Sequence, residues 1–146
     1  FFIMQLRSLL LNKNNHMQRK SAVFSLLMLA LSISLGAFGA HILKEMVDLE
    51  TQQTFETAVK YQFFCFIILL IISFQAEFTN KKYTPWIRIF ITGIVLFSGS
   101  LFTLVLGKIG HFNAHFAGPI TPLGGLFMIV GLLTIALQVA RNKPKQ

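Results

Sequence analysis

The chain has 146 residues, of which 54% are hydrophobic and only 12% are charged. Soluble domains carry about a quarter charged residues, so this composition argues against a water-soluble fold. The single cysteine, Cys65, excludes an intramolecular disulfide and a multi-cysteine metal site. The composition instead favours a small integral membrane protein.

Four segments are long and apolar enough to cross a bilayer, at about residues 21–40, 61–78, 86–107 and 119–140. A hydrocarbon core about 30 Å thick requires about 20 apolar residues of helix, because every backbone polar group there must be paired within the protein. None of the four segments has a charge near its middle. We therefore predict an all-α membrane protein, a bundle of four transmembrane helices that forms one domain over residues 21–140.

The residues on either side of this domain are predicted to be tails, over residues 1–20 and 141–146. The chain reaches a Met-Gln-Arg-Lys run only at Met17, so residues 1–16 are either a tail or sequence upstream of the native start. A signal peptide is the alternative for the first apolar run. This run reaches about 19 residues, whereas the apolar part of a signal peptide has about 7–15, so we expect an uncleaved helix.

The basic residues indicate the orientation of the bundle. Ten of the 13 precede the first segment, flank the connection between the second and third, or follow the fourth. Only Lys44, Lys60 and Lys108 lie in the opposite connections. Because short loops rich in Lys and Arg stay in the cytoplasm, we expect both termini to be cytoplasmic. The net charge of +8 then needs no nucleic-acid partner, which would require basic residues interleaved with stacking aromatics.

The two connections on the outer side are polar. The first, about residues 41–60, shows apolar spacing that predicts short amphipathic turns lying on the membrane interface. It holds four of the five acids: Glu45, Asp48, Glu50 and Glu56. The second carries His111 and His115, four residues apart, but Gly and Pro residues around them argue against a regular helix that would aim both at one metal ion. We expect neither a metal nor a cofactor.

Small residues recur at four-residue spacing within the segments, as in Ser32-Gly36-Ala40 and Gly99-Thr103-Gly107. Such ridges let helix backbones approach one another closely in lipid, and serines between helices form hydrogen bonds. The residues predicted to pack helices together are Ser32, Gly36, Gly39, Ala40, Ser98, Gly99, Ser100, Gly124 and Gly125.

Four motifs occur in order along the chain. They are Gly36-Ala-Phe-Gly-Ala-His-Ile-Leu43, Phe55-Glu-Thr-Ala-Val-Lys-Tyr-Gln62, Phe97-Ser-Gly-Ser-Leu101 and Gly118-Pro-Ile-Thr-Pro-Leu-Gly-Gly125. In order and spacing they resemble the signatures of the transmembrane protein 256-like family, whose bacterial members are known as domain of unknown function 423. The resemblance covers about residues 20–140. It implies a four-helix protein of bacterial inner membranes with animal relatives, and it implies no established reaction.

Polar residues of these motifs fall near the outer ends of the segments: His41, Tyr61, Gln62 and Thr121. We expect them to form one polar cluster beneath the outer surface. Thr121 also precedes Pro122, a pattern that predicts a hydroxyl cap and a proline in the first turn of the last helix.

We expect a noncatalytic bundle with a structural, lipid-binding or partner-binding role. Its partners would be the lipid bilayer and either a second copy or another membrane protein. The alternative is a permease for small solutes or ions, which would act as an oligomer because four packed helices leave little room for a pore. An enzyme is not expected, since the sequence shows no nucleophile with a base and no set of metal ligands.

Overall fold

The structure is a computed structural model that describes residues 3–4, 16–74 and 82–141. Within these ranges the chain forms four long helices and no strand: α2 (His16–His41), α3 (Leu49–Phe74), α4 (Thr84–Ile109) and α5 (Ile120–Arg141). Two single 3-10 turns, η1 (Leu43–Glu45) and η3 (His115–Ala117), lie in the connections at one end. All four long helices are apolar and long enough to cross a membrane, which confirms the predicted fold class.

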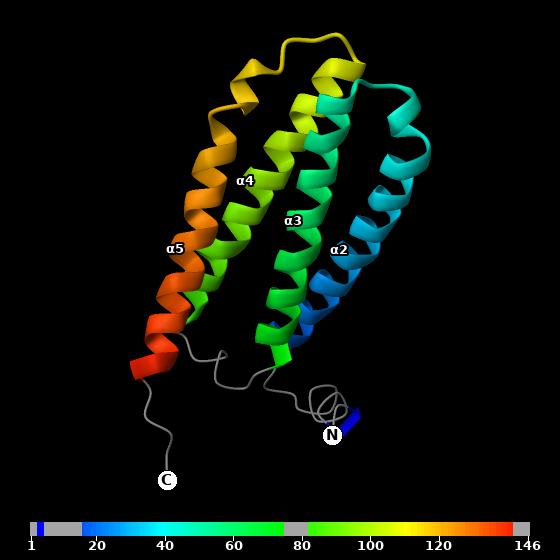
Figure 1. Cartoon of the computed structure of the whole chain (residues 1–146). Coiled ribbons are helices and arrows are strands. Elements are labelled where there is room, and N and C mark those ends of the chain that lie inside the picture. Colours follow the sequence, from blue (N-terminus) through cyan, green and yellow to red (C-terminus); the bar gives the residue numbers. More distant parts are fainter. Residues whose placement is uncertain (1–2, 5–15, 75–81, 142–146) are drawn as a thin grey trace.

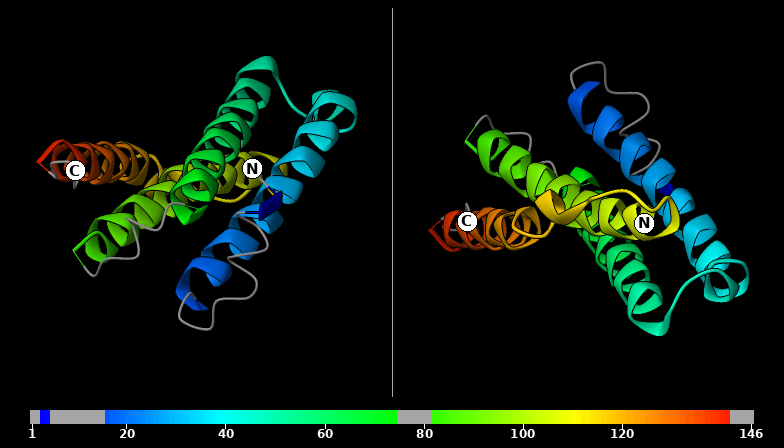
Figure 2. Two further views of the ribbon diagram at one scale, coloured as in Figure 1. Left: turned by 90° about the horizontal axis from the view of Figure 1, so that it is seen from below. Right: turned by 90° about the horizontal axis from the view of Figure 1, so that it is seen from above.

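The helices run up and down as two antiparallel pairs, α2 with α3 and α4 with α5, so that α2 begins and α5 ends at the same end of the molecule (Figure 1). They touch in chain order, α2 against α3, α3 against α4, and α4 against α5. Seen along the bundle, α2 and α5 lie on opposite sides and the two pairs cross where α3 meets α4 (Figure 2). The inner helices α3 and α4 are therefore more buried than α2 and α5.

The start of α3 differs most from the sequence prediction. The helix begins at Leu49, whereas the second span was expected from residue 61. The short interfacial turns predicted over about residues 41–60 are wrong from residue 49 onward, because residues 49–60 belong to α3 and turn Phe55 and Ala58 into the bundle. The last part of the predicted span, residues 75–78, lies outside the described residues.

Asp48 explains why α3 begins so early. Its Oδ1 accepts the backbone N–H of Thr51 at 2.8 Å, which satisfies one of the donors that a helix N-terminus leaves free. This hydrogen bond is the main cause of a lowered pKa at Asp48, and the charge of Lys108 acts in the same direction. A helix of 26 residues is about 39 Å long, so the polar first turns of α3 extend beyond a hydrocarbon core about 30 Å thick.

Glycines bring α4 and α5 into backbone contact. A Cβ on Gly124 would lie 2.8 Å from Phe97 Cα, and one on Gly131 would lie 2.9 Å from the backbone nitrogen of Phe90. A Cβ on Gly93 would lie 2.6 Å from the backbone nitrogen of Met128. The two residue numbers in each of these pairs have the same sum, as a single antiparallel register requires. Only glycine fits at these positions, because the atoms opposite are backbone and cannot rotate away.

The contact between α2 and α3 uses a different spacing from the predicted one. Ser25, Ser32 and Gly39, seven residues apart, are buried, whereas Gly36 and Ala40 are exposed. A Cβ on Gly39 would lie 2.8 Å from the ring of Phe55. Residues seven apart are offset by only about 20° around a helix, whereas a ridge of four-residue steps drifts by about 40° per step and leaves the contact.

The inner pair, α3 and α4, meets through aromatic rings and a compact apolar core. Phe55 and Phe102 pack edge to face with centroids 5.5 Å apart. Further along, the core is formed by Cys65, Phe66, Leu69, Phe90, Ile94 and Met128. Met128 extends this core to α5, and Met28 and Leu29 of α2 pack against it, so all four helices contribute.

The two adjacent glycines of α5 provide a test of this register. We expect Gly124→Ala to lower stability by about 1–3 kcal/mol, the usual cost of overpacking, because its Cβ meets the backbone of α4. Gly125→Ala should be neutral or slightly stabilising, since its Cβ would lie 3.7 Å from the nearest atom of the Phe97 ring. Thermal unfolding of both variants in the same mild detergent measures the difference. Equal midpoints would contradict the register.

Candidate functional site: interhelical polar contacts and a lateral groove

The four residues expected to form one outer polar cluster are distributed over separate places. Gln62 bonds to α2, since its Nε2 donates to Ser32 Oγ at 2.9 Å. The ring of Tyr61 packs on Phe97 of α4, with centroids 4.9 Å apart. Thr121 pairs with α4, and His41 is exposed at the end of α2. The structure therefore does not bring these four side chains together.

Thr121 does not cap α5, contrary to the sequence prediction. The helix begins one residue earlier, at Ile120, and the Thr121 hydroxyl lies 2.7 Å from Ser100 Oγ and 3.4 Å from the carbonyl oxygen of Ala117. A hydroxyl inside the first turn reaches the preceding turn and the neighbouring helix rather than a free N–H of its own helix. Pro122 does stand in the first turn, where a missing N–H costs nothing.

A chain of buried hydrogen bonds links α3 to α2. Gln62 donates to Ser32, and Ser32 Oγ donates in turn to the carbonyl oxygen of Met28 at 2.8 Å. Ser32 is 1% exposed and Gln62 is 4% exposed, so water does not compete for either group. In an apolar surrounding these bonds strengthen one another, and losing one partner leaves the other unsatisfied.

Three consecutive residues of α4, Ser98 to Ser100, face three different neighbours. Ser98 Oγ donates to the carbonyl oxygen of Ala58 on α3 at 3.2 Å. Ser100 shares its hydroxyl bond with Thr121 on α5. Between them, a Cβ on Gly99 would meet nothing within 4 Å. Gly99 was predicted to pack helices together, but within this chain it faces open space.

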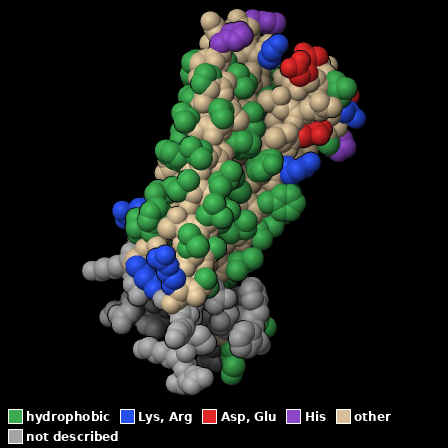
Figure 3. Space-filling model, turned by 60° about the vertical axis from the view of Figure 1, so that its left-hand side comes forward, with side chains coloured by type: hydrophobic (Ala, Val, Ile, Leu, Met, Phe, Trp, Pro, Cys, Tyr) green, Lys and Arg blue, Asp and Glu red, His purple; other side chains and the backbone are tan. Residues whose placement is uncertain are grey.

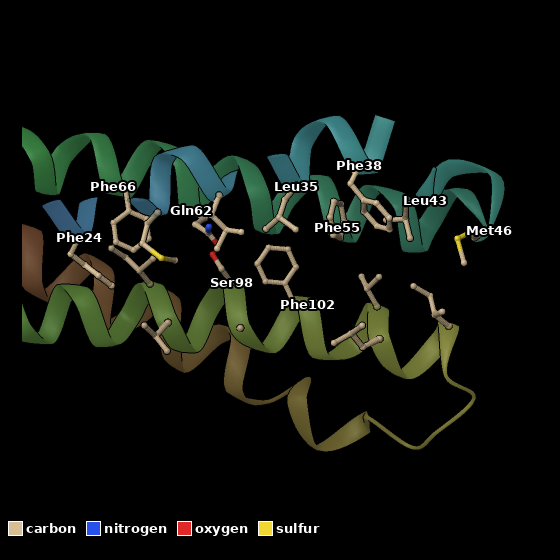
Figure 4. A pocket seen from close by; sticks show the side chains of 18 residues that line it. Phe24, Leu35, Phe38, Leu43, Met46, Phe55, Gln62, Phe66, Ser98 and Phe102 are labelled. Atoms are coloured by element: carbon tan, nitrogen blue, oxygen red, sulfur yellow. The ribbon is translucent and has the colours of Figure 1, made fainter. Parts of the chain in front are cut away.

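That open space is a groove between α2 and α4, with α3 as its floor and a volume of about 660 Å³. Large apolar side chains such as Phe24, Leu35 and Phe102 point into it (Figure 4). Of its 18 lining residues only Gln62 and Ser98 are polar, and both lie near its middle. The groove therefore suits a hydrocarbon and not an ion or a polar solute.

The two histidines of the connection between α4 and α5 do not share a helical face. His111 lies in a turn after α4 with a φ of 52°, and His115 lies in η3. Both are exposed. Among the described residues there is no group of three or more His, Cys, Asp or Glu side chains that could hold a metal ion.

Sequence reasoning missed several positions at the helix contacts. Ser25, Gly93 and Gly131 are buried at these contacts, and they were not among the residues predicted to pack helices. The signal that identifies them is small residues seven apart, as in Ser25-Ser32-Gly39 and Gly124-Gly131. The start of α3 was also marked, by Asp48 followed by Glu50 in the first turn.

Four apolar helices joined by short connections, with buried hydrogen bonds between neighbouring helices, define a small multi-span membrane protein. The chain belongs to the family described as "Protein of unknown function (DUF423)", whose model matches residues 35–125. This range includes all four sequence motifs and leaves out residues 16–34 of α2 and residues 126–141 of α5. The family predicted from the motifs is thus confirmed.

Relatives occur in bacteria and in yeast. The chain is 35% identical to a "UPF0382 membrane protein" of Schizosaccharomyces pombe over 106 residues, 72% of this chain and 88% of the relative. It is 32% identical to the "UPF0382 membrane protein YwdK" of Bacillus subtilis over 115 residues, 76% of this chain and 88% of the relative. A Staphylococcus saprophyticus relative is 36% identical over 73% of this chain and 85% of its own length. No solved structure matches the chain.

The link between Gln62 and Ser32 can be measured with a double-mutant cycle. We expect Ser32→Ala and Gln62→Leu each to destabilise the protein, with a coupling energy of about 0.6–2 kcal/mol between them. Ser34→Ala is the matched control, because Ser34 is exposed and bonds only to the carbonyl oxygen of Ala30 in its own helix. Unfolding of all variants in one detergent gives the coupling, and a value near zero would contradict a direct bond.

Proposed function

We propose that this protein is a noncatalytic component of the plasma membrane, whose helical bundle has a structural role and binds lipid or a membrane partner. The observation that supports this proposal is that buried polar side chains form hydrogen bonds between helices. Gln62, Ser98 and Ser100 bond to neighbouring helices, which holds the bundle together. The polar motif residues are thereby engaged in packing rather than gathered around a reacting group.

The outward faces of the bundle suit contact with lipid or with another membrane protein. On α2 and α5 the exposed residues include Leu27, Ile33, Leu133 and Leu137, each between 59% and 64% exposed. Hydrophobic side chains cover the length of the molecule between its ends (Figure 3). Such a surface needs hydrocarbon or protein against it.

The charge distribution supports an orientation with both termini in the cytoplasm. Arg19, Lys20, Arg88 and Arg141 lie at the end where α2 begins and α5 ends. Acidic side chains gather at the opposite end, where His41 and the two loop histidines also lie (Figure 3). This arrangement follows the rule that basic flanks remain inside. In a bacterium the membrane would be the inner membrane.

Cysteine labelling tests the orientation. Asn113→Cys places a thiol in the exposed connection between α4 and η3, and Arg141→Cys places one at the exposed end of α5. We expect a membrane-impermeant maleimide to label the first variant on intact cells and the second only after permeabilisation. The unmodified chain is the control, because its Cys65 is buried. The reverse pattern would overturn the proposed orientation.

Flux measurements separate the noncatalytic bundle from a permease. We expect proteoliposomes that contain the chain to take up glycerol and K⁺ no faster than protein-free vesicles, because the groove is apolar and opens sideways. A faster uptake that is lost in folded Gln62→Ala, and kept in Ser34→Ala, would contradict the proposed function and favour a permease.

A further inference from the structure

The groove between α2 and α4 has the length and position of a lipid chain. Its lower part extends along α2 from Phe24 to Leu35, which is about 16 Å at about 1.5 Å per residue. Half of a hydrocarbon core about 30 Å thick has nearly the same depth. In this part the groove is lined by Phe24, Met28 and Leu31 from α2 and by Val95 and Gly99 from α4. A chain that enters from the terminal side of the membrane would end near Gln62.

Positive charge lies at this end of the groove. Phe24 also lines a second hollow, of about 320 Å³, together with Arg19, Lys20, Val23 and Leu27. Phe24 is therefore a wall shared by the apolar groove and by a hollow that carries two exposed cations. At the other end the neighbouring charges are mixed, since Glu45 and Asp48 lie close to Met46 in the sequence while Lys44 and Lys108 adjoin Leu43 and Ile109. Arg19 and Lys20 have no acid near them in the sequence, so the charges favour an anionic group at their end.

We propose that the groove is a binding site for an anionic phospholipid of the leaflet on the side of the termini. One acyl chain lies in the groove against Met28, Val95 and Gly99, and the phosphate lies beside Arg19 and Lys20. Clustered Arg and Lys side chains at this level of a membrane recognise anionic headgroups by charge and hydrogen bonding. The inference rests on the proposed function for a lipid-binding role, and it adds the class of lipid and the residues that recognise it.

Charge favours this lipid over a helix from a second copy. A second copy in the same membrane has the same orientation, so α2, α4 or α5 of that copy would bring its own basic end to Arg19 and Lys20. The basic residues at those ends are Arg19 and Lys20 on α2, Arg88 on α4 and Arg141 on α5. Like charges at close range in a poorly hydrated site oppose such docking. A phosphate has the opposite sign and no such penalty.

Native mass spectrometry tests the site with defined lipids. The full chain is reconstituted in vesicles of equimolar phosphatidylglycerol and phosphatidylcholine with identical acyl chains, and is then released in mild detergent. We expect one retained phosphatidylglycerol per chain, with a preference of about thirtyfold over phosphatidylcholine, because each of the two cations near an anionic headgroup favours it by about fivefold.

Two pairs of variants separate the chain site from the headgroup site. Gly99→Leu should fill the groove and abolish retention of both lipids, whereas Gly36→Leu should not, although the Cβ at Gly36 also has room, 3.9 Å from Val59. Arg19→Gln with Lys20→Gln should keep bound lipid but lose the preference for phosphatidylglycerol. Arg88→Gln with Arg141→Gln removes two exposed cations at the same end, and it should change neither the retention of lipid nor the preference for phosphatidylglycerol.

Three results would overturn the proposal: equal retention of the two lipids by the unmodified chain, unchanged retention in Gly99→Leu, or a lipid-free dimer that Gly99→Leu dissociates. The last result would assign the groove to a second copy. None of these bears on whether the bundle conducts solutes, because the flux measurement tests that separately. Conversely, solute flux through the protein would leave the lipid measurement valid.

Discussion

Backbone contact between α4 and α5 is the constraint on which the rest of the bundle depends. In lipid there is no hydrophobic drive between helices, so association relies on dispersion and on hydrogen bonds, both of which act only at short range. Gly93, Gly124 and Gly131 let the two backbones approach until no Cβ fits between them. This closeness brings the Ser100 and Thr121 hydroxyls to 2.7 Å and fixes the face that α4 presents to α3.

The groove is a consequence of how unevenly α2 is held. It packs on α3 through Gly39 and the Ser32–Gln62 bond, while its other neighbours are few. In water such a gap lined by Phe and Leu side chains would collapse or bind a partner. In a bilayer it is stable, because hydrocarbon from the surroundings fills it without cost. A small membrane protein thus keeps an open flank that a soluble bundle of this size lacks.

The polar residues of the motifs belong mostly to the packing of the bundle. Ser98 and Ser100 bond in opposite directions, to α3 and to α5, and this pair fixes α4 between its two neighbours. Gly99, between them, is left to the groove. One short motif therefore serves both the assembly of the helices and the site proposed for lipid, which links the stability of the fold to the shape of the binding surface.

The sequence by itself determined the number of helices, the membrane as their solvent and the uneven charge of their ends. These are local properties: span length and apolar composition are read along the chain, and α4 and α5 begin and end within two residues of their predicted bounds. The early start of α3 is also a local property of the sequence, because Asp48 caps the helix. It was missed because the span was delimited by apolar composition alone.

Only the tertiary structure decided which small residues make contacts. Gly124 and Gly125 are neighbours of identical chemistry, yet one touches the backbone of α4 and the other has room for a side chain. The same holds for Gly93 at a contact and Gly99 at the groove, and for Gln62 and Thr121, which bond to different helices. The reason is that the face a helix buries depends on its rotation and on its crossing with its neighbours. Those are set by the shapes of all the helices together and by no single segment.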